Sequence, residues 1–149
     1  MKEHTLHLEA SWNKTLSVKQ KMQLKEVVQS LPTIINEFAV VGLLGKYKKN
    51  GGFVATILLR NGFNETLKIG EASIEVFDGN NTIIAKGQFH PQLRIKANAS
   101  QPWSFVFTEQ MIINDEADLR TWSIQMKADG LPDARTFSNI PSNACFMQH

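Results

Sequence analysis

Hydrophobic and polar positions follow a helical period near the start of the chain. Ser17 and Gln20 have the spacing of a capping box, and apolar residues then recur every three or four positions. Because Pro32 cannot continue a helix, we expect an N-terminal amphipathic helix over residues 17–30. Its predicted apolar stripe contains Val18, Met22, Val28 and Leu31, with Leu24 or Val27 beside it.

After residue 34 the helical period ends, and short stretches rich in Val, Ile, Phe and Thr alternate with turn residues. The clearest hairpin signal is the turn at 49–52, which joins predicted strands at 37–47 and 53–60. Both faces of 53–60 are mostly apolar, so we expect this strand to be central and covered on one side by the helix. Further strands are predicted at 72–78, 82–89, 103–107 and 119–126, with a brief pairing at 67–69.

This succession of short strands predicts an all-β fold. We expect an immunoglobulin-like antiparallel β-sandwich of about six or seven strands, with one N-terminal amphipathic helix. Residues 90–102 contain few apolar positions and are predicted to be a connection that crosses between the sheets. A single domain is therefore expected over residues 1–128, including the helix at 17–30, followed by an irregular tail at 129–149.

Composition agrees with one ordinary soluble domain: the chain has 149 residues, of which 42% are hydrophobic and 20% charged. No apolar run approaches the roughly 18–20 residues of a membrane-spanning helix, and the first residues lack the apolar core of a secretory signal. We therefore expect a cytoplasmic protein, with peripheral attachment to a membrane left open. The net charge is +2, and no basic run is interleaved with aromatic residues, so nucleic-acid binding is not expected.

A search for catalytic residues finds no convincing constellation. The single cysteine, Cys145, has no histidine near it in sequence, and the histidines lie at both termini and in one loop: His4, His7, His90 and His149. The densest carboxylate cluster lacks the spacing of an EF-hand and consists of Asp115, Glu116 and Asp118. We expect no enzyme activity, cofactor or metal site. A small enzyme that uses His90 with Asp78 or with the acidic cluster is the weaker alternative.

Several segments, in their order and spacing, resemble the SLAP domain family. They are SWNKTLS, SLPTI, GGFVATILLRNGFNETLKIGEASIEVFD, IAKGQF, SQPWSFVF and LRTWSIQM, and together they cover roughly residues 8–127. The family occurs in Firmicutes and takes its name from the S-layer assembly protein that works with the accessory Sec secretion system. The resemblance implies no enzyme activity.

The family motif falls on eight positions of this chain, and each has a structural explanation. We expect the serine to cap the helix, the asparagine to form a turn, the proline to fix the chain before a strand and the tryptophans to fill the core. These positions are Trp12, Leu16, Ser17, Arg60, Asn61, Pro102, Trp103 and Trp122.

Two functions follow as hypotheses. The first is a non-enzymatic protein-binding or adaptor module whose partner is the secretion machinery or an export substrate, as the resemblance implies. The second is an extracytoplasmic carbohydrate- or cell-wall-binding β-sandwich module whose leader was removed. Association with a second copy also stays open, because a strand with two apolar faces can be covered by a partner chain.

Overall fold

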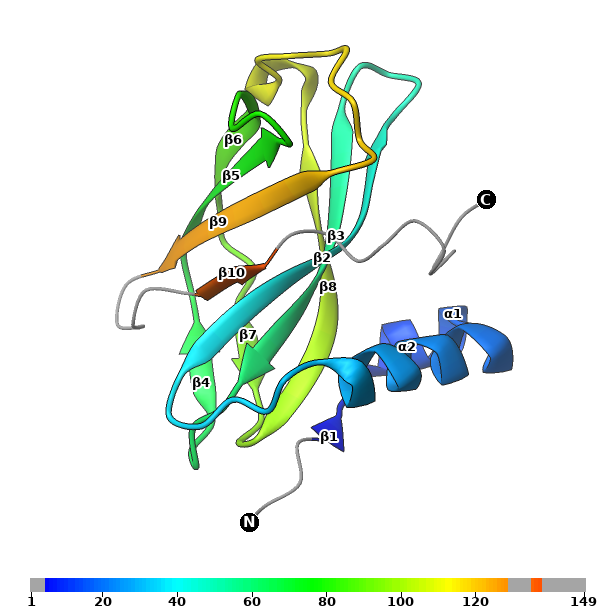
Figure 1. Cartoon of the computed structure of the whole chain (residues 1–149), viewed down its shortest axis with the longest axis vertical. Coiled ribbons are helices and arrows are strands. Elements are labelled where there is room, and N and C mark those ends of the chain that lie inside the picture. Colours follow the sequence, from blue (N-terminus) through cyan, green and yellow to red (C-terminus); the bar gives the residue numbers. More distant parts are fainter. Residues whose placement is uncertain (1–4, 129–134, 138–149) are drawn as a thin grey trace.

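The computed structural model describes residues 5–128 and 135–137. Most of these residues lie in β-strands, and two short helices precede the main sheets (Figure 1). The elements are β1 (Thr5–Leu6), α1 (Ala10–Thr15), α2 (Val18–Ser30), β2 (Phe38–Tyr47), β3 (Phe53–Asn61), β4 (Leu67–Ile69), β5 (Ala72–Asp78), β6 (Ile83–Phe89), β7 (Leu93–Ile95), β8 (Ala99–Phe107), the 3-10 helix η1 (Glu109–Met111), β9 (Trp122–Ala128) and β10 (Arg135–Phe137).

The strands form two main sheets. One has five strands in the order β1-β8-β3-β2-β10, and the other has three in the order β6-β5-β9. Strands β4 and β7 pair separately, yet their ladder continues the β5–β6 hairpin: Ile69 pairs with Leu93, and Ala72 pairs with Phe89. The second strand has one extra residue between these pairs, so a bulge divides one long hairpin into two ladders. The mostly β prediction is confirmed, while the immunoglobulin-like arrangement stays a prediction.

The main core lies between the sheets. Alternate residues of the central strand β3, such as Ile57 and Leu59, pack there against Ile74 of β5 and Ile124 of β9. The ring of Trp122, at the start of β9, is only 2% exposed and lies against two glycines of β2. Side chains contributed by both sheets therefore hold them together.

A second core covers the outer face of the five-stranded sheet. Leu24 and Val28 of α2 are buried there together with Val41 of β2 and Leu58 of β3. The expectation that β3 is central and covered by the helix is thus confirmed. Because β3 is apolar on both faces, it contributes to both cores.

Helix α2 begins as the sequence predicts. Ser17 Oγ accepts the Gln20 backbone N–H at 3.1 Å, and Gln20 Oε1 accepts the Ser17 N–H at 2.9 Å, which completes the capping box. The predicted apolar stripe is wrong in part, because Val18 and Met22 are 74% and 60% exposed. The helix is rotated so that Leu24 faces the sheet, and its first two turns present Val18 and Met22 to solvent.

Other boundaries also differ from the prediction. The stretch 90–102 leads from one sheet to the other as expected, but it contains β7 and the first residues of β8. Neither β1 nor α1 was predicted, and β9 begins three residues later than expected. Within the predicted irregular tail, residues 135–137 form β10, which pairs in parallel with β2. The remaining tail residues, 129–134 and 138–149, lie outside the described residues.

Candidate functional site

The outer face of the three-stranded sheet is polar and is the surface that we consider first. In β5, Ala72 and Ile74 point into the core, so the alternation of a strand turns Ser73 outward. Strand pairing places Gln88 of β6 on one side of Ser73 and Lys127 of β9 on the other. Three strands thus bring polar side chains into one row across the sheet.

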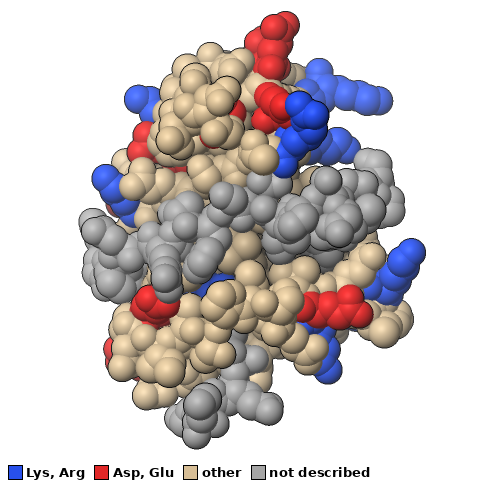
Figure 2. All heavy atoms as spheres, viewed as in Figure 1, with Lys and Arg blue, Asp and Glu red and all other residues tan. Residues whose placement is uncertain are grey.

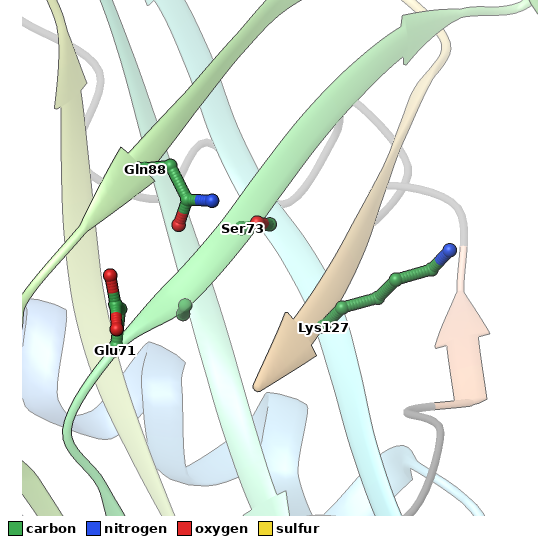
Figure 3. A pocket seen from close by; sticks show the side chains of 5 residues that line it. Glu71, Ser73, Gln88 and Lys127 are labelled. Carbon is green, nitrogen blue, oxygen red and sulfur yellow. The ribbon is translucent and has the colours of Figure 1, made fainter. Parts of the chain in front are cut away.

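A shallow depression of about 160 Å³ lies at this row and is lined by Glu71, Ala72, Ser73, Gln88 and Lys127 (Figure 3). The Gln88 amide points over β5, whereas the Lys127 side chain extends away from Ser73. Pockets that enclose small molecules usually measure about 300–1,000 Å³. The depression therefore suits a polar side chain or a backbone amide of a partner better than a whole metabolite.

The charges around the depression are mixed. Glu71 Oε1 lies 3.8 Å from His90 Nε2, and both side chains are more than half exposed. Ser73 and Gln88 can each donate and accept hydrogen bonds, while Lys127 can only donate. In the view of Figure 2, which does not single out the depression, basic and acidic side chains lie near one another mainly around the margins of the molecule. Such a surface can form specific polar contacts without a strong preference for one sign of charge.

Strand β6 is an edge of its sheet, next to the depression. The Ile84 C=O accepts the backbone N–H groups of Ile113 and Asn114, at 2.7 and 3.0 Å, which covers the start of the edge. An isolated bridge between Ala85 and Ile112 belongs to the same cover, and among the described strands only β5 pairs with β6 beyond it. In a strand, the N–H and C=O of one residue point to the same side, and this side alternates from residue to residue. Gln88 is four residues after Ile84, so its N–H points away from β5, as the Ile84 C=O does.

Five of the family-motif residues, including Arg60, lie on the opposite side of the molecule, at the outer face of the five-stranded sheet. Trp12 of α1 is half-buried and packs with buried Leu16 in the second core, and Ser17 follows at the start of α2. Pro102 is buried and lies opposite Leu58. We expected this proline before a strand, but it lies within β8.

Proline is tolerated at that position because, among the described strands, only β3 pairs with β8 there. The Ser100 C=O accepts the His7 N–H, so the same edge of β8 faces β1 and the segment that follows it. Position 102 is two residues after Ser100, so a backbone N–H at 102 would point to the same edge as the Ser100 C=O. The two residues of β1 end before this position, so proline removes no hydrogen bond between β1 and β8. The missing donor therefore costs the β3–β8 ladder nothing.

Arg60 is a buried cation on the outer face of the five-stranded sheet. Its side chain is 1% exposed, and its Nη2 donates to the Pro32 C=O at 2.8 Å. Burial lowers the pKa of Arg60, and the negative charge of Glu37 offsets part of this effect. The other two guanidinium nitrogens, Nε and Nη1, have no hydrogen-bond partner among the described residues. Arg60 thus fastens the segment after α2 to β3.

Asn61 connects three segments through its side-chain amide. Its Nδ2 donates to the C=O groups of Glu65, Ile95 and Lys96 at 2.8–3.1 Å, and its Oδ1 accepts the Phe63 N–H at 2.8 Å. The predicted turn role is confirmed by the bond to Phe63 and extends to the end of β7. The two N–H hydrogens of the amide are shared among the three C=O groups, so both the nitrogen and the oxygen of this buried side chain have partners.

Trp103 and Trp122 face the main core, as expected for core residues. Trp122 is buried, and Trp103 is half-buried at the margin of the same cluster. The eight motif positions therefore do not converge on one site: they divide between the outer face of the five-stranded sheet, the Asn61 side chain and the main core between the sheets.

The candidate catalytic residues are also dispersed. Asp78 Oδ1 accepts the Asn80 and Thr82 N–H groups at 2.9 Å, which stabilises a turn, and His90 lies next to Glu71 instead. Within residues 5–128 and 135–137, no group of three or more His, Cys, Asp or Glu side chains has the geometry of a metal site. Three candidates lie outside the described residues: His4, Cys145 and His149.

The acidic cluster lies in the loop before β9, and its last member forms an ion pair. Arg120 Nη2 lies 2.7 Å from Asp118 Oδ2, and this partner lowers the pKa of Asp118 to about 2. Nearby, Tyr47 Oη donates to the Asn114 C=O and accepts the Ala117 N–H, at 2.7 and 3.0 Å. Burial raises the pKa of Tyr47, although the bond from Ala117 opposes this. These interactions fix the conformation of the loop.

The residues of the depression were not among the predicted sites. The alternation of polar and apolar residues in 72–76 could have indicated that Ser73 faces outward. Gln88 and Lys127 become its neighbours only through strand register, which no local pattern specifies. Separately, none of the helices in the described ranges is both long and apolar enough to cross a membrane.

Comparisons with solved structures find only distant resemblance. An X-ray structure of a structural-genomics target is 13% identical, with a TM-score of 0.41, and covers 78% of this chain and 95% of its own. A protein from Archaeoglobus fulgidus is 10% identical, with a TM-score of 0.38, and covers 70% and 92%. DesR, a β-glucosidase from Streptomyces venezuelae solved with D-glucose, is 10% identical, with a TM-score of 0.37, and covers 68% and 15%. We draw no functional argument from these similarities.

None of the curated proteins compared with the chain matches it. The family comparison, in contrast, covers nearly every described residue. The SLAP domain matches residues 6–128, from β1 to the end of β9. The resemblance seen in the sequence is thereby confirmed, and this chain belongs to the SLAP domain family.

Proposed function

We propose that this chain is a non-enzymatic protein-binding module in S-layer protein export through the accessory Sec system. The secretion context comes from the SLAP domain family, and the mode of binding comes from the later part of β6, which only β5 pairs with among the described strands. An extended segment of an export substrate or of the secretion machinery adds to this edge as a further strand. Main-chain hydrogen bonds then supply affinity, and side-chain contacts supply specificity.

The outward-facing N–H of Gln88 is the observation that carries this proposal. It lies at the part of β6 that pairs only with β5 among the described strands, and its side chain lines the depression. A strand added at this edge would place one of its side chains beside the Gln88 side chain, at the border of the depression. The Gln88 amide both donates and accepts hydrogen bonds, so it can pair with an acidic or amide side chain of that strand.

The carbohydrate-binding alternative receives less support from this surface. Sugar-binding sites commonly provide an aromatic face on which a pyranose ring can stack. The residues that line the depression are Glu71, Ala72, Ser73, Gln88 and Lys127, and none of them is aromatic. A peptide is therefore the ligand class that this surface suits better.

Exchange of Gln88 for proline tests the proposal. Proline removes the edge N–H but is tolerated on edge strands, so the Gln88→Pro variant should fold and fail to bind. The Gln88→Ala variant keeps the N–H and is the matched control. Photocrosslinking in cells from position 88, with position 49 at the exposed β2–β3 turn as a second control, should capture an accessory Sec component or an S-layer precursor.

Two results would contradict the proposal. One is equal capture of the same proteins by crosslinking from positions 88 and 49, and the other is undiminished pull-down of those proteins by the Gln88→Pro variant. Crosslinks that join only two copies of this chain would instead assign the β6 edge to self-association.

A further inference from the structure

Helix α2 presents an apolar face to solvent in addition to the one it buries. Val18 and Met22 are 74% and 60% exposed and lie four residues apart, so they are neighbours on the helix surface. Leu24 and Val28 already attach the helix to the sheet. Folding therefore does not require apolar residues at positions 18 and 22.

Lysines surround this exposed pair. Helices α1 and α2 together contain four lysines and one acidic residue, Glu26. Lys21 follows Val18 by three residues, and Lys25 follows Met22 by the same interval, so each apolar side chain has a cation beside it. Within the described part of the chain, no ion pair involves any of the four lysines, which are Lys14, Lys19, Lys21 and Lys25.

The two helices lie on the outside of the five-stranded sheet, next to each other at one side of the molecule (Figure 1). Apolar side chains on a surface helix can enter the boundary between lipid headgroups and acyl chains, while long lysine side chains reach the headgroups. We propose that the α1–α2 face docks on an anionic lipid surface, with Val18 and Met22 inserted and the lysines bound to the headgroups.

An acidic protein suits this surface less well than a membrane does. Two side chains one helical turn apart provide little apolar area, whereas specific protein interfaces bury roughly 800 Å² on each partner. Reversible membrane binding needs only shallow insertion combined with several cations near an anionic surface. The α1–α2 face has this combination of features.

This inference does not depend on the proposed role of β6. The helices cover the outer face of the five-stranded sheet, and β6 belongs to the other sheet. A domain held to a membrane through α1 and α2 could still offer the β6 edge to a partner. Failure of one proposal would therefore leave the other standing.

Co-sedimentation with vesicles tests the inference on the full chain. We expect binding to phosphatidylcholine vesicles that contain about 30% phosphatidylglycerol, release at high salt and no binding to phosphatidylcholine alone. The double variant Val18→Ser/Met22→Ser should bind at least about tenfold more weakly. The Ile35→Ser variant is the matched control, because Ile35 is 66% exposed but lies outside the helices. It should bind like the original chain.

The double variant should keep its fold because both side chains are exposed, and circular dichroism can verify this. Exchange of Lys19 and Lys25 for glutamine should weaken binding at low salt and reduce its salt dependence. Equal binding to the two kinds of vesicle, no binding to either, or unchanged binding by the double variant would overturn the inference. Binding of a polyglutamate peptide in place of vesicles, lost in the same double variant, would reassign the face to an acidic protein.

Discussion

The contact between Gly42 and Trp122 provides a sharp test of how the two sheets pack. A Cβ atom on Gly42 would lie 2.9 Å from Cη2 and 3.0 Å from Cζ2 of the Trp122 ring. Carbon atoms in favourable contact are about 3.5–4.0 Å apart. The Gly42→Ala substitution therefore forces the indole or strand β2 to move, and Trp122 is confined because it is only 2% exposed.

The size of the effect follows from two opposing terms. Overpacking of a well-filled core costs about 1–3 kcal/mol. Replacement of glycine by alanine also restricts the unfolded chain, which offsets about 0.4–1 kcal/mol. We expect Gly42→Ala to lower the free energy of unfolding by about 1–2 kcal/mol, which corresponds to a fall in Tm of about 2–8 °C.

Gly70→Ala is the matched control. The atom nearest to a Cβ on Gly70 is Gln92 Nε2 at 4.0 Å, so the new methyl group meets no close neighbour. The substitution then acts only by restricting the unfolded chain. Its Tm should stay the same or rise slightly.

The assay is urea and thermal unfolding followed by far-ultraviolet circular dichroism. The double variant Gly42→Ala/Trp122→Phe completes a cycle, because the smaller ring makes room for the new methyl group. We expect a favourable coupling of at least about 1 kcal/mol between the two substitutions. Two results would refute the packing argument. One is that the effects of the two substitutions on the free energy of unfolding add within about 0.5 kcal/mol, and the other is that Gly42→Ala destabilises the protein no more than Gly70→Ala.

Three further predictions concern polar side chains. The Ser17→Ala variant removes the bond from Ser17 Oγ to the Gln20 N–H and should cost about 1 kcal/mol in chemical denaturation, with Ser17→Asp close to the original chain. Asn61→Ala leaves three C=O groups without their amide donor and should cost about 2–4 kcal/mol; a loss below about 1 kcal/mol would show that water replaces the amide. The carboxyl of Asp118 should titrate at about 2 by NMR, below its ordinary value of 3.8, and Arg120→Gln should raise its pKa. Because the pKa is lowered in the folded state, the pair stabilises the protein above pH 3.8 and loses this contribution as the pH falls toward 2.

The sequence predicts those elements in which local signals agree. The capping box defines the start of α2, and the turn at 49–52 defines the β2–β3 hairpin. Strand β5 has the predicted boundaries because its polar and apolar residues alternate over 72–76 and a turn sequence follows Asp78. In each case the chemistry that decides the structure lies within a few neighbouring residues.

The other elements depend on partners that are distant in the sequence. Strand β7 has only three residues and is stabilised by pairing with β4, so residues 90–102 resemble a loop. The rotation of α2 was predicted incorrectly because its apolar residues cover more than one face, and only contact with Val41 and Leu58 selects Leu24 and Val28. The candidate site depends on the register of three strands, so the sequence around any one of its residues does not predict which residues lie beside it.

The order of strands in the five-stranded sheet has a consequence for synthesis on the ribosome. The β2–β3 hairpin emerges early, but residues 62–98 must be added before β8 can pair with β3, which takes about 2–8 s at about 5–20 residues per second. During this interval the hairpin exposes the apolar residues that later pack in the main core. Helix α2 has already been made and can cover the face of the hairpin that contains Leu58. Only the opposite face, which later packs in the main core, then needs to be covered by other parts of the chain or by a chaperone.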